Sequence, residues 1–406
     1  MRLLHTSDWH LGQHFMGKSR QAEHQALIDW LLDQIEAQSV DAVLIAGDLF
    51  DTGTPPSYAR ELYNQLVVRL HAAGVALLLL GGNHDSPATL NESRALFARL
   101  GATVVAAAGD DPAAQVVVLP RRGGGAGCVV CAVPFVRPRD VLRSQAGQSA
   151  EDKQLSLQQA IERHYAAVHA AAQAKIAELG VGLPIVATGH LTTVGASASE
   201  AVREIYVGAL EAFPTAAFPP ADYIALGHIH RPQKVGGLEH VRYSGSPLPL
   251  GFDEAKQQKE MLLVDLDADG LRTITPLPVP RFQGLVAIAG NLDSLSGAIG
   301  AAAAEGTRER PTWLEITVTD DDYLADLPAR IEALTDGWPV EVLRIRRQRG
   351  DAVARLAATA GETLAELEPD EVFARRLGQE TLDDALRAEL TGRYRAVVAG
   401  LRGDDA

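Results

Sequence analysis

The sequence predicts a layered α/β domain followed by a small α/β domain and a helical tail. Up to about residue 280, short apolar runs alternate with longer segments whose apolar residues recur at helical spacing. A shorter version of this alternation follows, and beyond Arg349 the chain becomes helical and acidic. Alternating strands and helices are typical of α/β layers. In this chain of 406 residues we expect domains at 1–280 and 281–349 and a helical segment at 350–406.

The predicted elements of the first domain follow one another in a regular order. Two amphipathic helices are expected at 21–38 and 58–74, the second ending at a capping Gly74, and a long Ala-rich helix is expected from Asp152 to Leu179. Apolar runs predict buried strands at residues 2–7, 41–48, 75–82, 184–190 and 223–228.

Residues 260–279 predict a β-hairpin with a D-G turn. Asp265, Asp267 and Asp269 imitate the start of a calcium-binding loop, but the twelfth position of that loop requires a Glu and is Pro276 here. The small domain that follows is expected to contain two helical segments and strands at 284–290, 312–318 and 339–347.

The composition limits the classes of function. The formal net charge of −15 argues against a broad basic surface that coats nucleic acid. Nucleic acid can still be a substrate, because bound metal ions offset local carboxylates. Any DNA contact should then be local or shared with a partner. We find no apolar run near the roughly 20 residues of a bilayer span, and Asp8 interrupts any signal-like segment, so we expect no membrane association and a cytoplasmic location.

The only cysteines, Cys128 and Cys131, form a C-x-x-C in the run "CVVCAVPFV". This spacing can indicate zinc or redox chemistry. Here the pair lies in a β-branched run, where residues three apart point to opposite faces of a strand, and the chain has no second pair. We therefore expect two core cysteines.

Polar clusters follow directly on the apolar strands of the first domain. In α/β sheets, ligands bind beyond the carboxyl ends of the strands, so these clusters should meet at one rim. Any single member could be an ordinary cap or turn residue, but the whole set predicts one site. Its members are Asp8 and His10, Asp48, Asn83 with His84 and Asp85, His190, and finally His228 and His230 in "YIALGHIHRPQ".

The chemistry of this set predicts a metal centre. Carboxylates, imidazoles and one amide suit a borderline divalent ion such as Mn²⁺, Fe²⁺ or Zn²⁺, and suit Ca²⁺ poorly. The set offers more ligands than one ion needs, and two ions about 3.5–4 Å apart with a bridging carboxylate would use them all.

The pattern D-x-H, G-D, G-N-H-D, G-H, G-H-x-H resembles the calcineurin-like metallophosphoesterase superfamily, which implies a layered metallophosphoesterase sandwich. The resemblance implies that His84 binds no metal and acts as the catalytic acid or charge stabiliser. It also implies a first ion held by Asp8, His10, Asp48 and His230, and a second held by Asp48, Asn83, His190 and His228.

Longer motifs narrow the resemblance to the SbcD family of bacterial nuclease subunits. These are "HTSDWHLGQ", "GDLFDTGTPPSYAR", "GNHDSPATLNESR", "ATGHLTTVGA", "ADYIALGHIHRPQ" and "YSGSPLPL". The family implies a Mn²⁺-dependent DNA exonuclease and endonuclease that acts on duplex ends, hairpins and single strands in repair, recombination and replication. It also implies an SbcC-type coiled-coil ATPase partner and a homodimer within a heterotetramer.

Two rival classes of function, a different phosphoesterase and a non-catalytic scaffold, differ in what they need from the sequence. A protein phosphatase of the same superfamily tends to carry G-D-x-x-D-R-G, but Thr52 follows Asp51 here; a small-molecule phosphodiesterase remains the other alternative. A non-catalytic scaffold would have lost ligands, and no ligand position is lost.

The tail predicts a partner-binding helix pair. Pro369 and Gly378 bound a shorter stripe of Val372, Phe373 and Leu377. The alternative is packing on the chain's own small domain, and the family resemblance instead implies a grip on the base of the SbcC coiled coil. The longer stripe, at steps of three or four residues, is Leu382, Leu386, Leu390, Tyr394, Val397 and Leu401.

Overall fold

The computed structural model describes residues 1–142, 150–197, 212–319, 326–348, 373, 377 and 384–403. Its internal contacts divide the chain into two compact units, 1–287 with 305–314, and 288–304 with 315–406. The predicted tail residues Val372 and Leu382 lie outside the described residues.

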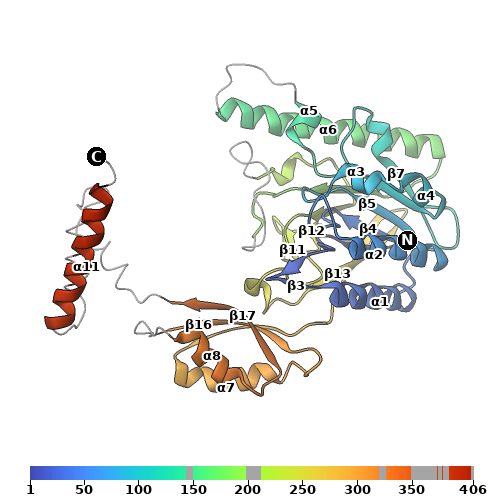
Figure 1. The fold of residues 1–406 in the computed structure, drawn as a ribbon. Helices are drawn as coiled ribbons and strands as arrows, with labels where there is room; N and C mark the ends of the chain where they lie inside the picture. Colours follow the sequence, from blue (N-terminus) through green and yellow to red (C-terminus); the bar gives the residue numbers. More distant parts are fainter. Residues whose placement is uncertain are drawn as a thin grey trace. The chain divides into compact units, whose positions relative to one another are not determined.

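The first unit is built on two six-stranded sheets (Figure 1). The spatial order of the first sheet is β14 (Gly270–Pro278), β13 (Glu260–Asp267), β1 (Arg2–Thr6), β4 (Ala42–Ala46), β5 (Ala76–Leu80) and β6 (Ala102–Val105). Strands β1, β4, β5 and β6 are parallel, and β13 and β14 add an antiparallel edge.

The second sheet has a parallel centre and an antiparallel strand at each edge. Its spatial order is β11 (Gln233–Val235), β12 (Leu238–Tyr243), β10 (Tyr223–Gly227), β9 (Ile185–His190), β8 (Ala126–Cys131) and β7 (Val116–Pro120).

Helices cover the outer face of each sheet, which gives four layers (Figure 1). The helices α1 (Gln21–Ala37) and α2 (Ser57–Ala72) pack on the first sheet, and α6 (Ala150–Leu179) packs on the second. Shorter elements complete the unit: β2 (His14–Phe15), β3 (Lys18–Ser19), α3 (Pro87–Asn91), α4 (Arg94–Arg99), α5 (Pro138–Val141) and the 3-10 turns η1 (Pro112–Gln115), η2 (Thr215–Ala217) and η3 (Phe252–Glu254).

Strand alternation builds three apolar cores from these layers. In β4, Val43 and Ile45 face the helices, whereas Leu44 faces the other sheet. The same alternation places Cys128 between the sheets and Cys131 against α6. Both cysteines are free and buried, so the expectation of two core cysteines is confirmed.

The second unit is described separately. A three-stranded sheet has the order β15 (Leu285–Gly290), β16 (Thr312–Val318) and β17 (Val340–Arg347). The helices whose bounds the structure describes in this unit are α7 (Leu292–Ala303), α8 (Leu327–Thr335) and the tail helix α11 (Asp384–Gly403). Among the helices that the structure describes, none has the length and hydrophobicity that a bilayer span needs.

Candidate metal centre

The ends of β1, β4, β5, β9 and β10 bring all the predicted site residues together. Parallel pairing sets this meeting point, because Thr6 of β1 lies opposite Ile45 of β4, and Gly227 of β10 lies opposite His190 of β9. The polar residues that follow these strands therefore emerge at the same rim of their sheets. Three overlapping clusters result, each with ligand atoms within 4.8 Å of one another: Asp8, His10 and His230; Asp48, His190 and His228; and His10, Asp48 and His84.

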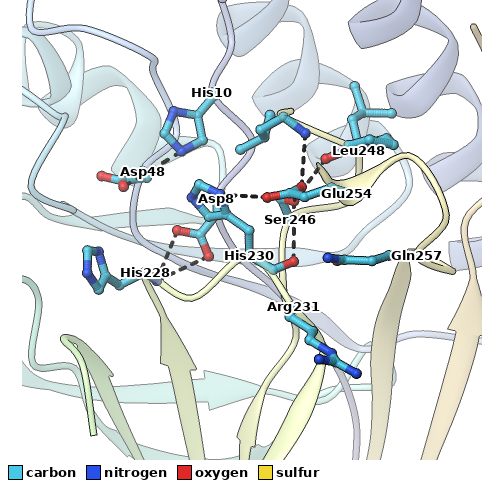
Figure 2. A network of polar contacts seen from close by, with 12 residues as sticks. Asp8, His10, Asp48, His228, His230, Arg231, Ser246, Leu248, Glu254 and Gln257 are labelled. Atoms are coloured by element: carbon cyan, nitrogen blue, oxygen red, sulfur yellow. Dashed lines mark hydrogen bonds and ion pairs between the residues drawn. The ribbon is translucent and has the colours of Figure 1, made fainter. Parts of the chain in front are cut away.

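Asp48 lies at the junction of the clusters. Its Oδ2 is 3.8 Å from Nε2 of His10 (Figure 2). The same oxygen is 3.2 Å from Nε2 of His190. Asn83 joins the same junction, because its Oδ1 lies 2.9 Å from Nε2 of His190. The Asp48 carboxylate can therefore contact the cluster that contains His10 and the cluster that contains His190 at the same time.

Oxygen acceptors fix the orientation of the imidazoles. Nδ1 of His190 lies 2.9 Å from the carbonyl of Ala46, and Nδ1 of His84 lies 2.7 Å from the carbonyl of Asp51. A carbonyl only accepts, so each Nδ1 carries a proton and each ring directs its Nε2 into the site. Metal-binding histidines are commonly held this way.

Two buried nitrogen atoms test whether the site suits a metal. Nε2 of His10 and Nε2 of His228 are buried and have no hydrogen-bond partner among the described residues. An unpaired buried polar atom costs free energy, so such atoms need an explanation. Both belong to clusters of oxygen and nitrogen ligands, and the residues therefore fit a divalent metal ion.

The backbone at the site is strained in a regular way. Asp8, His10, Asp48 and His228 have positive φ values of 55°, 49°, 51° and 96°. Side chains disfavour these conformations, which cluster at functional sites. The turn after each strand thus aims its polar side chain into the rim instead of continuing the sheet.

Two glycines allow the loops to approach one another closely. A Cβ at Gly47 would lie 2.3 Å from Nδ1 of His190, and one at Gly82 would lie 2.1 Å from Oδ1 of Asp48. Neither position can carry a side chain without moving Asp48 or His190. The glycines of the "GD" and "GN" motifs are therefore steric requirements of the site.

The pKa values of His190 and His228, which share a cluster with Asp48, are shifted in opposite directions. Burial lowers the pKa of His190, but the adjacent Asp48 carboxylate outweighs burial and raises it to about 9. Burial lowers the pKa of His228 to about 3, and the neighbouring His190 adds to this effect. Without metal, His190 therefore holds a proton at neutral pH, whereas His228 is ready to donate a lone pair.

Two acidic residues that were not predicted to be ligands support the site. Oδ1 of Asp51 lies 3.1 Å from Nδ1 of His10. The carboxylate of Asp85 accepts from the backbone N–H groups of Leu49, Phe50 and Gly82 and so joins two of the loops. Asp51 lies in "GDLFDTG" and Asp85 lies in "GNHDSP", each close to a predicted ligand. That proximity in sequence is the signal that could have identified them.

Glu254 is the contact that the sequence did not reveal. It lies in η3, and its Oε1 is 3.2 Å from Nδ1 of His230 (Figure 2). Burial alone would raise the pKa of Glu254, but the hydrogen bond from His230 and the charge of Lys259 outweigh it and hold the pKa well below its ordinary value. Glu254 is therefore a buried carboxylate.

Comparisons with known proteins agree with the geometry. Residues 1–232 match the family described as "Calcineurin-like phosphoesterase", and residues 281–381 match the "Type 5 capsule protein repressor C-terminal domain".

Individual relatives extend this match. The chain is 51% identical over 404 residues to the SbcD subunit of the nuclease SbcCD from Escherichia coli K12, covering 100% of this chain and 99% of the relative. It is 32% identical to the corresponding subunit of Rhodobacter capsulatus, over 92% of this chain and 94% of the relative, and 29% identical to that of Bacillus subtilis, over 65% and 66%. The chain therefore belongs to the SbcD family of metal-dependent nucleases, within the calcineurin-like phosphoesterases.

Proposed function

We propose that this chain is a two-metal DNA nuclease, with exonuclease activity on duplex ends and endonuclease activity on hairpins and single strands. The observation that supports the proposal most strongly is the convergence of three ligand clusters around Asp48, with two buried histidine nitrogens left without a hydrogen bond among the described residues. The nuclease names of the relatives supply the substrate class.

The residues divide naturally between two ions, most suitably Mn²⁺. Asp8, His10 and His230 would hold the first, His190, His228 and Asn83 would hold the second, and Asp48 would bridge them. The ions would supply Lewis-acid charge to the phosphate oxygens and would activate the attacking water.

The protein's own groups prepare this chemistry. The carbonyls and carboxylates behind four of the rings keep their Nε2 atoms directed at the centre, so these rings do not have to reorganise on binding. The four are His10, His84, His190 and His230. His84 lies in one cluster with His10 and Asp48, and its Nδ1 is held by the carbonyl of Asp51, so its Nε2 is the ring nitrogen that would face the phosphate. We assign His84 the role of stabilising charge or protonating the leaving sugar oxygen.

The test is one matched assay. Purified chain with Mn²⁺ or Mg²⁺ is given hairpin DNA, a phosphopeptide and a simple phosphodiester, with and without its ATPase partner. We expect metal-dependent DNA cleavage that a chelator abolishes. Intact DNA together with hydrolysed phosphopeptide would favour the phosphatase alternative.

We also propose an assembly with an SbcC-type ATPase through the C-terminal helices, as a homodimer within a heterotetramer. The names of the relatives support the partnership itself, because they are subunits of SbcCD. The exposed Leu386 and Val397 of α11 support the choice of surface. The domain division at 280 and 349 and the cytoplasmic location stay predictions from the sequence.

A further inference from the structure

Behind His230 lies an ion pair that the proposed mechanism does not use. Glu254 and Lys259 are 0% and 3% exposed, and Oε2 of Glu254 is 2.7 Å from Nζ of Lys259. Removing two charges from water costs several kcal/mol per ion in typical proteins, and their attraction often fails to repay it. Stability alone is therefore a weak reason for this pair, and its contacts suggest another.

The pair holds His230 at two points. Glu254 contacts the ring through Nδ1 at 3.2 Å (Figure 2). Nζ of Lys259 donates to the backbone carbonyl of His230 at 3.0 Å. Ser246 adds a third contact, because its backbone N–H donates to the same carbonyl at 3.1 Å. Both the ring and the peptide of His230 are thus fixed.

The hydrogen-bond partners of Lys259 suit a charged ammonium group that holds its neighbours in place. Its Nζ lies within 3.3 Å of four acceptors: the His230 carbonyl, Ser246 Oγ, Glu254 Oε2 and Gln257 Oε1. An ammonium has three protons to donate and no lone pair, so it suits a shell made only of acceptors.

The remaining bonds of Glu254 keep it in place. Its Oε2 accepts the backbone N–H of Leu250 at 3.0 Å. Phe252, in the same 3-10 turn, packs edge-on against Phe15, with ring centroids 5.2 Å apart. The carboxylate is therefore anchored independently of His230, as a group that orients another must be.

We propose that Glu254 and Lys259 are positioning residues for metal binding at the first ion site. Glu254 accepts the Nδ1 proton of His230 and so presents Nε2 to the ion, while Lys259 fixes the backbone that carries the ring. This inference rests on the proposed two-metal function and adds a role for residues outside the ligand motifs.

The experiment measures Mn²⁺ binding to the full chain by titration calorimetry, beside cleavage of hairpin DNA. We expect Glu254→Gln to weaken one of two Mn²⁺ sites by about 10–100-fold and to leave the other unchanged, the range typical for loss of such outer contacts. Cleavage should fall in kcat with KM for DNA unchanged, and excess Mn²⁺ should restore it.

The chain offers a matched control. Lys234 and Glu239 form an ion pair with the same five-residue separation, at 2.6 Å, but their side chains are 51% and 64% exposed. Glu239→Gln and Lys234→Met should leave Mn²⁺ binding and cleavage unchanged.

A double variant separates positioning from folding. Glu254→Leu with Lys259→Met removes both charges, a change that often leaves stability intact. We expect its melting temperature to stay closer to that of the wild type than the melting temperature of Lys259→Met alone, while the weak Mn²⁺ site persists.

The outcomes distinguish the two proposals. If wild-type chain binds two Mn²⁺ ions and cleaves DNA, and Glu254→Gln does both equally well, the positioning role is wrong. If the double variant regains normal Mn²⁺ affinity, the pair serves stability only. If wild-type chain binds no Mn²⁺, the proposed function itself fails.

Discussion

At the scale of single residues, a substitution of His84 can separate metal binding from catalysis. It lies within 4.8 Å of ligand atoms of His10 and Asp48, yet its own Nδ1 is held by the carbonyl of Asp51. A group that acts on the transition state contributes to rate without holding the ions.

We predict that His84→Ala keeps both ions and cleaves DNA about 10²–10³-fold more slowly, the cost typical for one lost transition-state donor. Asp48→Ala is the matched comparison, because it removes the carboxylate that contacts both clusters and should release metal. Metal analysis of the purified variants beside single-turnover cleavage checks this. Loss of metal from His84→Ala would make His84 a ligand.

At the scale of elements, the strand ends explain why so much of the site could be predicted. Successive side chains of each of these strands pack alternately into two different cores. A one-residue slip in register would therefore exchange the two faces of the strand. The strands are β1, β4, β5, β9 and β10. The residue after each strand then has little freedom of placement.

Other elements of the fold are only weakly predicted by the sequence. β11 has three residues, and β12 reads "LEHVRY", which is too polar to suggest a strand inside a sheet. Glu254 meets His230 from 24 positions away through a short 3-10 turn. No local pattern encodes such a contact, because it depends on how two loops pack in the folded chain.

The tail helix α11 carries the prediction at this scale. Tyr394 stacks on Phe373 with centroids 3.9 Å apart, whereas Leu386 and Val397 stay 41% and 62% exposed. Exposed apolar residues on one helix face suit docking against another helix.

We therefore expect Leu386→Glu with Val397→Glu to abolish stable association with the SbcC-type ATPase, while Mn²⁺ binding persists. Ala388→Glu is the control, because it adds a carboxylate about 160° around the helix from Leu386 at 3.6 residues per turn. Co-purification of both variants with the partner decides the matter. Full-strength association of the double variant would exclude this face as the main contact.

At the scale of the whole molecule, charge governs how DNA is reached. With a net charge of −15, the chain repels the phosphate backbone except where bound cations or a partner offset it. A surface that neutralises few phosphates releases few counterions.

We predict that DNA binding by the chain alone depends strongly on Mn²⁺ but weakly on salt. A plot of log affinity against log salt should have a slope corresponding to about two or three phosphate contacts, and it should steepen when the ATPase is added. Fluorescence anisotropy with a labelled hairpin, at 50–200 mM salt, measures both. A steep slope for the chain alone would reveal a basic surface that its net charge does not suggest.

The positive φ angles of His10 and His228 have a consequence for how this protein changes over generations. Glycine would occupy either conformation more comfortably than histidine does, and it would also remove a buried nitrogen that has no hydrogen bond among the described residues. Folding alone therefore selects against these two histidines. Lineages that no longer need the chemistry should lose them early while keeping the four layers intact, so a surviving pair is itself a record of continued use.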